Sequence, residues 1–434
     1  MTAQRNRFLT DMLSTLFDRS DRFRGKSDAR DIQELCRALL SSEGVISGQR
    51  LAASVFERFR SLSDTDKIEF FKFLNDDLDI DTQSLAALTT VYENDPTPEA
   101  FVALSKSAEP KRQELLRRLN QPVGATADLV AMRVDLLSSL KQNPELARTD
   151  YDFDHLLRSW FNRGFLVLKA INWDTPARIL DKIVAYEAVH EISDLDDLRR
   201  RLYPPDRRCF AFFHPAMPDE PLIFVELALT KSIPRSVTRL LSEGRTPLEA
   251  EDAKVAVFYS ISNCQKGLSG ISFGNQLIKQ VVAELSIALP EIKKFVTLSP
   301  IPRLNRWLAD QENDPDHGHV ATAILQHRAT PQDVRAMAAR YLLLAKRDDG
   351  MPLDPVARFH LGNGAQIYDI HADADTSANG LAQSSGAMVN YLYDLTQTQQ
   401  RHEEFALDSV IAAAKSAQSL STSTLSAKPK ESSS

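Results

Sequence analysis

The stretch Val255–Pro302, VAVFYSISNCQKGLSGISFGNQLIKQVVAELSIALPEIKKFVTLSPIP, decides the fold of this chain. Its first seven residues are apolar and rich in β-branched and aromatic side chains, as in a buried strand. A polar turn with three glycines follows, and from Asn275 to Pro290 the apolar residues recur at helical spacing. The run Phe295–Leu298 is a second short strand, which ends at Ser299. The stretch therefore predicts a strand, a glycine-rich turn, a helix and a strand.

The glycine-rich turn has the composition of a phosphate-binding site. Gly267, Gly270 and Gly274 would let backbone N–H groups approach a ligand closely. The helix that follows contributes a partial positive charge at its N-terminus, and Lys266 adds a full charge. The spacing fits neither the P-loop nor the GxGxxG motif. With Gln265 at its start, the turn resembles the one that holds the coenzyme A pyrophosphate in acetyltransferase-like folds, although its glycine spacing is shifted. A tight strand-to-helix connection without a ligand is the alternative.

Length and composition are those of a globular enzyme with more than one domain. The 434 residues suffice for two or three domains, and 43% hydrophobic and 26% charged residues allow a sizeable core. The net charge of −7 argues against general binding to nucleic acids or membrane surfaces, but a local basic pocket remains compatible with it. Cys36, Cys209 and Cys264 are far apart and indicate a reducing compartment rather than a disulfide framework. No stretch is long enough for a transmembrane helix.

The order of predicted elements divides the chain into three parts. Residues 1–160 show only helical periodicity, with Thr97 and Thr126 as expected N-caps, and nothing in this part looks catalytic. Residues 161–415 give a strand, two helices, three strands, the glycine-rich turn, a helix and a strand, which is the order of the acetyltransferase-like (GNAT) fold. The expected fold class is therefore α+β. Residues 416–434 are rich in Ser, Thr, Ala and Lys and are expected to form a disordered tail.

Four segments together resemble the malonyl-CoA decarboxylase family. They are RRCFAFFHPAMPDEPLIFVELALT at Arg207–Thr230, SISNCQKGLSGISFGNQLIKQVV at Ser260–Val282, LSPIP at Leu298–Pro302 and PVARFHLGNGA at Pro355–Ala365. The similarity extends from Ile171 to Tyr391, whereas the helical region is similar to the family in character rather than in motif. The family usually has Asn before the last motif, and this chain has Asp354.

The resemblance implies a metal- and biotin-independent enzyme that converts malonyl-CoA to acetyl-CoA and carbon dioxide. No bound cofactor is implied, because coenzyme A is part of the substrate. The family has an N-terminal helical oligomerisation domain followed by an acetyltransferase-like catalytic domain, and its members are homotetramers. Eukaryotic relatives can carry mitochondrial and peroxisomal signals. Because this chain ends in ESSS, without a peroxisomal signal, we expect a bacterial-type cytoplasmic enzyme without nucleic-acid or membrane partners.

The resemblance also assigns the site residues. Ser299 in LSPIP corresponds to the proton acceptor, for which we also predict a role in positioning the carboxylate, and His360 in RFHLGNG corresponds to the proton donor. Imidazole titrates near neutral pH, which suits a general acid that protonates the enolate left by decarboxylation. The two side chains are expected to lie close together in a pocket reached from the turn. Malonyl-CoA is expected to contact both of them and the turn residues Lys266, Gly267, Leu268, Ser269, Gly270, Ile271, Ser272, Phe273, Gly274 and Asn275.

Some other residues carry weaker functional signals. His214 and His371 are candidates for supporting the pair, and Arg207 and Arg208 are candidates for phosphate contacts or ordinary solvated charges. Tyr391 could reach the site, but packing is the simpler interpretation.

Two further features have a structural rather than a catalytic interpretation. Cys264 precedes the turn and is expected to be a buried strand-end residue rather than a nucleophile. His317 and His319 lie among aspartates in a polar loop, but no further ligands stand at zinc spacing, so no metal site is expected.

Two other functions are compatible with the glycine-rich turn. An acyl-CoA-dependent N-acyltransferase would need a general base for an amine and an open acceptor groove. A non-catalytic acyl-CoA sensor acting through the helical region would tolerate the loss of Ser299 and His360. Without the resemblance, Ser299 would be interpreted as a strand-end residue and His360 as a core histidine bonded to a carbonyl.

Overall fold

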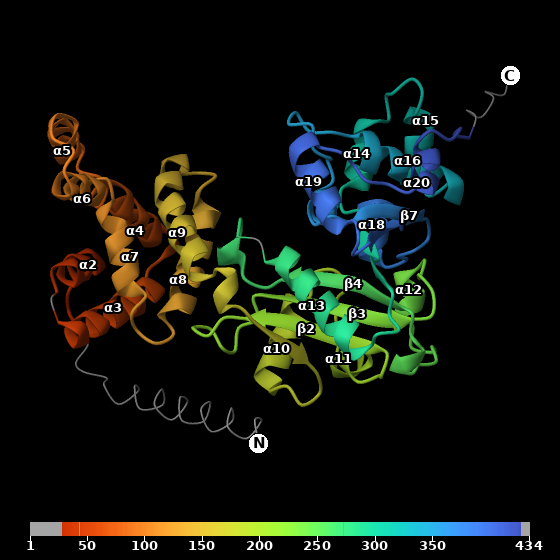
Figure 1. Cartoon of the computed structure of the whole chain (residues 1–434), viewed down its shortest axis with the longest axis horizontal. Coiled ribbons are helices and arrows are strands. Elements are labelled where there is room, and N and C mark those ends of the chain that lie inside the picture. The colour runs from red at the N-terminus through yellow and green to blue at the C-terminus, as the bar shows by residue number, and fades with distance from the viewer. Residues whose placement is uncertain (1–27, 43, 272, 427–434) are drawn as a thin grey trace. The chain divides into compact units, whose positions relative to one another are not determined.

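The computed structural model describes residues 28–42, 44–271 and 273–426, and it divides into two compact units (Figure 1). The first unit comprises Met1–Leu166 with two short later segments, His214–Pro218 and Gln265–Ser272. The second unit comprises Val167–Phe213, Asp219–Cys264 and Phe273–Ser434. The boundary that the sequence predicts near residue 160 thus lies close to the first division, while the two inserted segments of the first unit have no counterpart in that prediction.

Up to Leu166, all regular secondary structure in the described residues of the first unit is helical, as expected. Thr97 caps the N-terminus of its helix by accepting a hydrogen bond from the backbone N–H of Ala100. Thr126 does not cap its helix, because that helix begins at Ala125 and the Thr126 hydroxyl bonds to the side chain of Asn120 instead. The helices are α2 (Ile32–Ser41), α3 (Val45–Arg60), α4 (Asp64–Asp76), α5 (Thr82–Asn94), α6 (Pro98–Ser107), α7 (Lys111–Leu119), α8 (Ala125–Ser139) and α9 (Ala147–Trp160), with short 3-10 turns η2 (Pro144–Leu146), η3 (Arg163–Phe165) and η5 (Lys266–Leu268).

The second unit is built on an eight-stranded mixed sheet within the described residues. The strand order is β1-β2-β3-β4-β5-β8-β6, with β7 also paired to β8. Every pairing is antiparallel except that of β4 with β5, which the helix α13 joins as a crossover. The strands are β1 (Val167–Ile171), β2 (Arg207–Phe213), β3 (Ile223–Thr230), β4 (Val255–Asn263), β5 (Lys294–Thr297), β6 (Ser299–Pro300), β7 (Gln366–His371) and β8 (Met388–Tyr393).

Helices cover both faces of the sheet (Figure 1). Helices α10 (Ala177–Tyr186) and α11 (Leu195–Leu202) bury their apolar faces against alternate residues of β2, among them Cys209, Ala211 and Phe213. Helix α13 (Gly274–Ala288) buries the stripe that the sequence predicts, which consists of Leu277, Ile278, Val281, Val282 and Leu285. The element order strand, two helices, three strands, turn, helix and strand is therefore confirmed, and the unit has the α+β, acetyltransferase-like arrangement.

The remaining helices follow β5 or connect the strands. They are α12 (Val237–Leu240), α14 (Leu304–Asp310), α15 (Gly318–Leu325), α16 (Pro331–Leu344), α17 (Pro355–Gly362), α18 (Ala378–Ser384), α19 (Thr398–Asp408) and α20 (Lys415–Ser421), with a 3-10 turn η4 (Ala250–Asp252) before β4. Within the described residues, none of these helices or those of the first unit combines the length and the apolarity needed to cross a bilayer.

The prediction of a disordered tail from residue 416 is wrong for residues 416–426. This part contains α20, whose Ala417 and Leu420 are buried. Ser426 donates its backbone N–H and its hydroxyl to the carboxylate of Asp333, at 2.9 and 2.6 Å. The composition misled the prediction because only two apolar side chains, spaced three apart, are enough to bury one face of a two-turn helix. Residues 427–434 lie outside the described residues.

Candidate active site

Ser299 and His360 form the centre of the candidate site. Ser299 Oγ lies 3.2 Å from His360 Nε2, and the two residues are 6% and 2% exposed. Ser299 is the first residue of β6, two residues beyond the end of β5, and His360 lies in the last turn of α17. The sequence therefore predicted their proximity correctly, although the two residues are 61 positions apart in the chain and three helices lie between their elements.

The start of α17 explains how the sequence fixes His360. Asp354 is the N-cap, and its Oδ1 accepts a hydrogen bond from the backbone N–H of Ala357 at 2.8 Å. Pro355 occupies the first helical position, where its missing N–H costs nothing. Asn and Asp cap helices equally well, so Asp354 keeps the geometry that the family's usual Asn would give. Burial raises the pKa of the Asp354 carboxyl to about 6.

A chain of hydrogen bonds runs through the pair. Ser299 Oγ donates to Thr297 Oγ1 at 2.8 Å, and the Tyr393 hydroxyl lies 2.8 Å from His360 Nδ1. Because the Ser299 proton is engaged with Thr297, Ser299 Oγ accepts from His360 Nε2–H. Nδ1 of the neutral imidazole then carries the lone pair and accepts from the Tyr393 hydroxyl. The arrangement selects the tautomer with its proton on Nε2, facing Ser299.

Burial sets the charge state of His360. The ring is enclosed on all sides, and this burial lowers the pKa of His360 to about 3. The imidazole is consequently neutral at pH 7 in the unliganded protein. The expectation that this histidine titrates near neutral pH is thus wrong for the free site, because the enclosed position disfavours the imidazolium.

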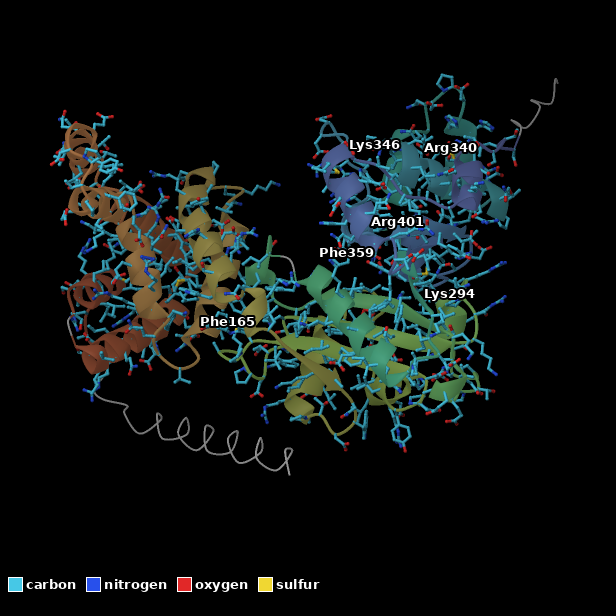
Figure 2. All side chains as sticks on the ribbon, in the orientation of Figure 1. Phe165, Lys294, Arg340, Lys346, Phe359 and Arg401 are labelled. Atoms are coloured by element: carbon cyan, nitrogen blue, oxygen red, sulfur yellow. The ribbon has the colours of Figure 1, made fainter. Side chains whose placement is uncertain are left out.

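Aromatic rings fix the plane of the imidazole. Tyr391 stacks on the His360 ring with centroids 4.5 Å apart and planes 26° apart, and Phe359 meets it edge-on at 5.0 Å. Phe359, labelled in Figure 2, also packs against the first residue of α13: a β-carbon at Gly274 would come within 2.5 Å of its ring. Only glycine allows this close approach. Tyr391 therefore does reach the site, where it contacts His360 by ring packing, and Gly274 brings the start of α13 beside the helix of His360.

Strands β4 and β5 separate next to Ser299 and His360. The parallel pairing of β4 with β5 ends at Phe258 and Thr297, and the last bond runs from the Leu298 N–H to the Phe258 carbonyl. Strand β4 continues to Asn263, so its last five residues extend beyond the ladder with β5. Two parallel strands that separate in this way leave main-chain groups of β4 available to a ligand of extended shape.

The glycine-rich turn is held by arginines of the helical unit. Arg133 donates to the carbonyls of Gly267 and Ser269 at 3.0 and 3.1 Å, and Arg158 donates to the carbonyl of Gly270 at 2.7 Å. Gly270 has φ +88°, a left-handed conformation that favours glycine. Arg133 is itself buried and paired with Asp150. The turn therefore has a defined shape imposed by guanidinium groups on its carbonyl side.

The other predicted turn residues differ in accessibility. Lys266 and Ser269 are exposed, Leu268 and Phe273 are buried, and Ile271 is half-buried. Ser272 and the side chain of Asn275 lie outside the described residues. Participation of these residues in coenzyme A binding stays a prediction.

The weaker candidates fall in different places. His214 belongs to the first unit, where its Nε2 lies 3.1 Å from the Trp160 carbonyl. Arg207 and Arg208 donate to backbone carbonyls, and Arg207 is buried beside Asp206, so both have structural contacts. Cys264 is buried directly after β4, and burial raises its thiol pKa, as expected for a non-nucleophilic residue. His371 connects indirectly to Ser299, through Asn390 and Thr297.

The polar loop that contains His317 and His319 is held by hydrogen bonds to other protein groups. His317 Nδ1 lies 3.1 Å from Asp314 Oδ1, and His319 Nε2 lies 2.8 Å from the Ser426 carbonyl. In the part of the chain that the structure describes, no group of three or more His, Cys, Asp or Glu side chains is arranged to hold a metal ion.

Sequence reasoning missed Thr297 and Tyr393. A signal existed for each: Thr297 precedes Ser299 by two residues, and Tyr393 follows Tyr391 by two, so each pair shares one face of an extended segment. What the sequence could not supply was the antiparallel pairing of β8 with both β5 and β6, which brings the two faces together around His360.

Comparisons with known proteins agree with this architecture. The family model of the malonyl-CoA decarboxylase C-terminal domain matches residues 164–433, and that of the N-terminal domain matches residues 78–161. In sequence, the chain is 47% identical to malonyl-CoA decarboxylase from Rhodopseudomonas palustris. The crystal structure of that protein matches with a TM-score of 0.83, and the match covers 89% of this chain and 98% of the other. It is 45% identical to malonyl-CoA decarboxylase from Agrobacterium vitis, whose crystal structure matches with a TM-score of 0.86. That match covers 90% of this chain and 99% of the other.

Curated relatives from animals are more distant. Mitochondrial malonyl-CoA decarboxylase from the goose Anser anser anser is 36% identical over 329 residues, which cover 67% of this chain and 65% of the relative. The rat protein is 33% identical over 329 residues, with 67% and 66% covered. The match therefore spans just under two thirds of the length of these relatives.

Proposed function

The chain belongs to the malonyl-CoA decarboxylase family, and on that premise we propose that it converts malonyl-CoA to acetyl-CoA and carbon dioxide. The observation that carries the proposal is the contact of 3.2 Å between the buried Ser299 Oγ and His360 Nε2. A buried hydroxyl–imidazole pair is suited to moving one proton beside a carboxylate.

The reaction needs an electron sink and a proton. When the bond between C2 and the carboxylate carbon breaks, its electron pair moves into the thioester as an enolate and carbon dioxide leaves. The enolate carbon then takes up one proton, so the overall reaction consumes one proton for each malonyl-CoA. Because the thioester carbonyl itself accepts the electron pair, we propose that no metal, biotin or other cofactor takes part.

Burial of His360 suggests where that proton comes from. The free site holds a neutral imidazole, since its pKa is about 3. A bound carboxylate next to the ring would favour the imidazolium, so the substrate and a proton would enter together. Loss of neutral carbon dioxide moves the negative charge from the carboxylate to the enolate, whose C2 is far more basic than the carboxylate was, so the enclosed imidazolium gives up its proton. We assign to His360 Nε2–H the transfer to C2, which restores the neutral ring.

Ser299 has the position of a group that orients the reacting carboxylate. Its Oγ accepts from His360 and donates to Thr297, so a substrate oxygen could replace Thr297 as the acceptor without breaking the contact to the imidazole. We assign Ser299 to carboxylate positioning and to accepting and relaying the proton. The turn Lys266–Asn275 is assigned to the coenzyme A part of the substrate, on the family resemblance and on its defined backbone shape.

The decisive experiment measures carbon dioxide and acetyl-CoA release from malonyl-CoA by the purified chain. Ser299→Ala and His360→Gln should each lower kcat on the order of a hundredfold or more. His317→Gln, which removes a histidine from a polar loop, is the matched control and should retain full activity. Binding of acetyl-CoA by calorimetry should persist in all three variants.

Two results would redirect the proposal. No product release from the parent chain, with acyl-CoA still bound, would point to the acyltransferase or the sensor. Full activity of Ser299→Ala and His360→Gln would exclude the assigned roles while leaving the reaction itself in place.

The helical unit carries a surface that suits self-association. Helices α5 and α6 bury none of their residues within this chain, and Val91, Phe101 and Val102 are 52%, 55% and 48% exposed. Exposed apolar groups on adjacent helices mark an association surface. We propose that this hairpin contributes to a homotetramer. Light scattering should give the tetramer mass for the parent and a smaller mass for Phe101→Glu, whereas an unchanged mass would exclude the hairpin.

We also propose a cytoplasmic location. The three cysteines are free and buried, which fits a reducing compartment. Fractionation of cells that express the tagged chain would test this, with recovery in an organelle as the contrary result.

A further inference from the structure

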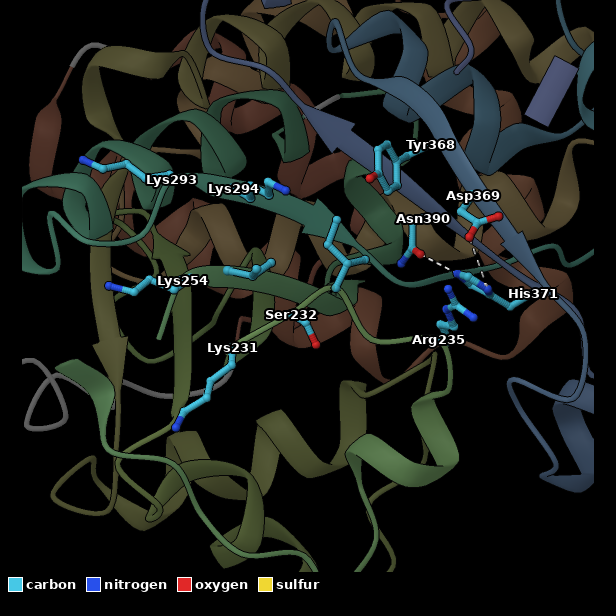
Figure 3. Close-up of a pocket in the computed structure, with 12 residues that line it drawn as sticks. Lys231, Ser232, Arg235, Lys254, Lys293, Lys294, Tyr368, Asp369, His371 and Asn390 are labelled. Atoms are coloured by element: carbon cyan, nitrogen blue, oxygen red, sulfur yellow. Dashed lines mark hydrogen bonds and ion pairs between the residues drawn. The ribbon is translucent and has the colours of Figure 1, made fainter. Parts of the chain in front are cut away.

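A basic pocket of about 400 Å³ lies at the end of the sheet where β4 and β5 begin (Figure 3). Its walls come from the segment after β3, from the starts of β4 and β5, and from β7 and β8. All of these belong to the second unit. The volume falls within the range of small-molecule sites. Its chemical character is set by five cationic side chains, which are Lys231, Arg235, Lys254, Lys293 and Lys294.

Two of the cations are directed at the pocket, and neither forms an ion pair within the described part of the chain. Figure 3 shows the amino group of Lys294 turned toward Tyr368 and the guanidinium of Arg235 beside the ring of His371. Among the described residues the structure records no ion pair for Lys294 or Arg235. By contrast, Lys254 is paired with Glu291 and Lys231 lies 3.9 Å from Asp252, and Figure 3 shows both amino groups turned away from Tyr368 and His371.

The acidic group in the wall does not neutralise the pocket. Asp369 is the only carboxylate among the residues that line it, and Arg335 donates to its Oδ1 at 3.2 Å. Asp369 Oδ2 is 3.9 Å from His371 Nδ1. An uncompensated positive field therefore remains in a concave site with low-dielectric walls, which concentrates anions.

The pocket is also connected to the candidate active site. Asn390 donates from Nδ2 to the Thr297 carbonyl at 2.8 Å, so its Oδ1 is the acceptor for His371 Nε2–H at 2.6 Å. Thr297 in turn accepts from Ser299 Oγ at 2.8 Å. A continuous series of bonds thus runs from His371, in the pocket wall, through Asn390 and Thr297 to Ser299. His371, one of the two histidines that the sequence suggested as a support for the pair, is thus connected to Ser299 through Asn390 and Thr297 without touching it.

We propose that this pocket is a second ligand site, which binds a small phosphorylated anion with two or more charges and thereby changes the rate at the Ser299–His360 pair. Lys294 and Arg235 contact the phosphate groups, and the anion reorients the His371 ring beside Arg235. The movement reaches Ser299 through Asn390 and Thr297. A free inorganic polyphosphate and a phosphorylated metabolite share the chemistry that these residues recognise.

The binding test uses the full chain and two probes. Calorimetry at low salt with inorganic pyrophosphate should show saturable binding, because its negative charges complement Lys294 and Arg235. Arg235→Ala/Lys294→Ala should weaken this binding at least tenfold. Arg239→Ala/Lys346→Ala removes two exposed cations of the same unit outside the pocket and should leave it unchanged. Because all four side chains are exposed, the melting temperature of each variant should stay at the parent value.

The second probe identifies the source of the anion. ADP binding at least tenfold tighter than pyrophosphate would assign the site to a phosphorylated metabolite, and equal or weaker ADP binding would assign it to inorganic polyphosphate. Absence of saturable binding of both probes would overturn the proposal, as would equal affinity in the pocket variant.

The rate test rests on the proposed decarboxylation, whereas the binding test does not. Saturating pyrophosphate should change kcat for malonyl-CoA at least twofold in the parent and in Arg239→Ala/Lys346→Ala, but not in Arg235→Ala/Lys294→Ala. If pyrophosphate instead competed with malonyl-CoA at the substrate site, it would raise KM equally in all three proteins and leave kcat unchanged. The two effects can therefore be told apart. Binding without a selective change in kcat would overturn the connection to Ser299.

Discussion

The hydroxyl of Tyr393 lies 2.8 Å from Nδ1 of His360, on the side of the imidazole opposite Ser299. In hydrolases with a serine–histidine pair, a carboxylate occupies the equivalent position and stabilises the imidazolium. A neutral phenol orients the ring without contributing a negative charge. This difference fits a site in which the substrate, rather than the protein, supplies the negative charge that draws a proton onto the histidine.

Removing this hydroxyl should therefore impair turnover rather than binding. Tyr393→Phe is expected to lower kcat about tenfold, the equivalent of one neutral hydrogen bond, with KM within twofold of the parent value. Steady-state kinetics with malonyl-CoA would measure both constants. Tyr391→Phe provides the comparison, because its hydroxyl is buried without a hydrogen-bond partner in the described structure and its ring would still stack on His360. Equal losses in the two variants would show that ring packing, not the bond to Nδ1, is what matters.

Proton uptake should accompany binding of the carboxylate. The pKa of His360 is about 3 in the free protein, so at pH 7.5 the ring is neutral and gains a proton only when an anion enters. Sulfoacetyl-CoA, which carries a sulfonate in place of the reacting carboxylate, cannot lose carbon dioxide and is a suitable probe.

We expect close to one proton to be taken up per molecule of this probe. Calorimetry in buffers of different ionisation enthalpy would measure the number, and acetyl-CoA, which lacks the anionic group, should give none. Uptake that persists in His360→Gln would place the proton elsewhere. No uptake by the parent would instead favour a neutral imidazole as the donor.

The N-cap of α17 should make stability depend on pH in an unusual direction. Burial raises the pKa of Asp354 from 3.8 to about 6, so between these values the folded chain binds more protons than the unfolded chain. Stability conferred by this group is therefore present below about pH 4 and is lost as pH rises toward 6. Asp354→Asn, which keeps a capping oxygen, should be more stable than the parent at pH 7.5 by about 2 to 3 kcal/mol, and this advantage should vanish near pH 4.

Asp333 offers a control of opposite sign. Burial opposes ionisation there, but hydrogen bonds from Ser426 and Thr330 outweigh it and hold the pKa of Asp333 below its usual value. Its stabilising effect is present above the unfolded pKa and is lost on acidification, so Asp333→Asn should melt below the parent at pH 7.5. Thermal unfolding of the three proteins at pH 7.5 and 4.5 would test both signs. A pH-independent difference between Asp354→Asn and the parent would contradict the assignment.

The buried arginine behind the glycine-rich turn should control affinity for the substrate. Arg133→Met removes the donors to the carbonyls of Gly267 and Ser269, and the turn should lose its defined shape. We expect KM for malonyl-CoA to rise about tenfold while kcat changes less than threefold, because the bonds act on the turn and not on the reacting groups.

Arg112→Met is the matched control for that variant. Arg112 is also buried and paired, with Asp79 and Asp152, but it makes no contact with the turn in the described residues. Both variants should melt at lower temperature, and only Arg133→Met should alter KM, measured well below both melting temperatures. A similar rise of KM in Arg112→Met would mean that general destabilisation of the helical unit is responsible.

Local sequence signals predicted much of the fold. The apolar run at residues 255–261 and the stripe from Leu277 to Leu285 set strand β4 and helix α13, because burial of one continuous face is visible in the spacing of the side chains. The short segment before Ser299 was identified for the same reason. The helical unit followed from its periodicity, although the N-cap expected at Thr126 was wrong because Gly124 occupies the N-cap position and the helix begins at Ala125.

Long-range pairing limited the prediction of the site. Ser299 and His360 were identified through a resemblance in motif, whereas Tyr393 enters the site only because β8 pairs with β5 and β6. The depressed pKa of His360 depends on enclosure by distant residues, which no local pattern encodes. The basic pocket could not be predicted either, because Arg235, Lys294 and His371 come from three separate segments of ordinary composition.

The first unit is discontinuous in sequence, and this constrains which recombination events its gene could have undergone. Two short segments, His214–Pro218 and Gln265–Ser272, interrupt the coding region of the second unit but fold with the first. A recombination breakpoint near residue 166 would thus transfer the helices of the first unit without the two later segments that belong to it. A foreign catalytic unit joined at that point would have to bring loops that complement the recipient helices. We therefore expect the two halves of the gene to share one ancestry, so that phylogenetic trees built from each half separately coincide.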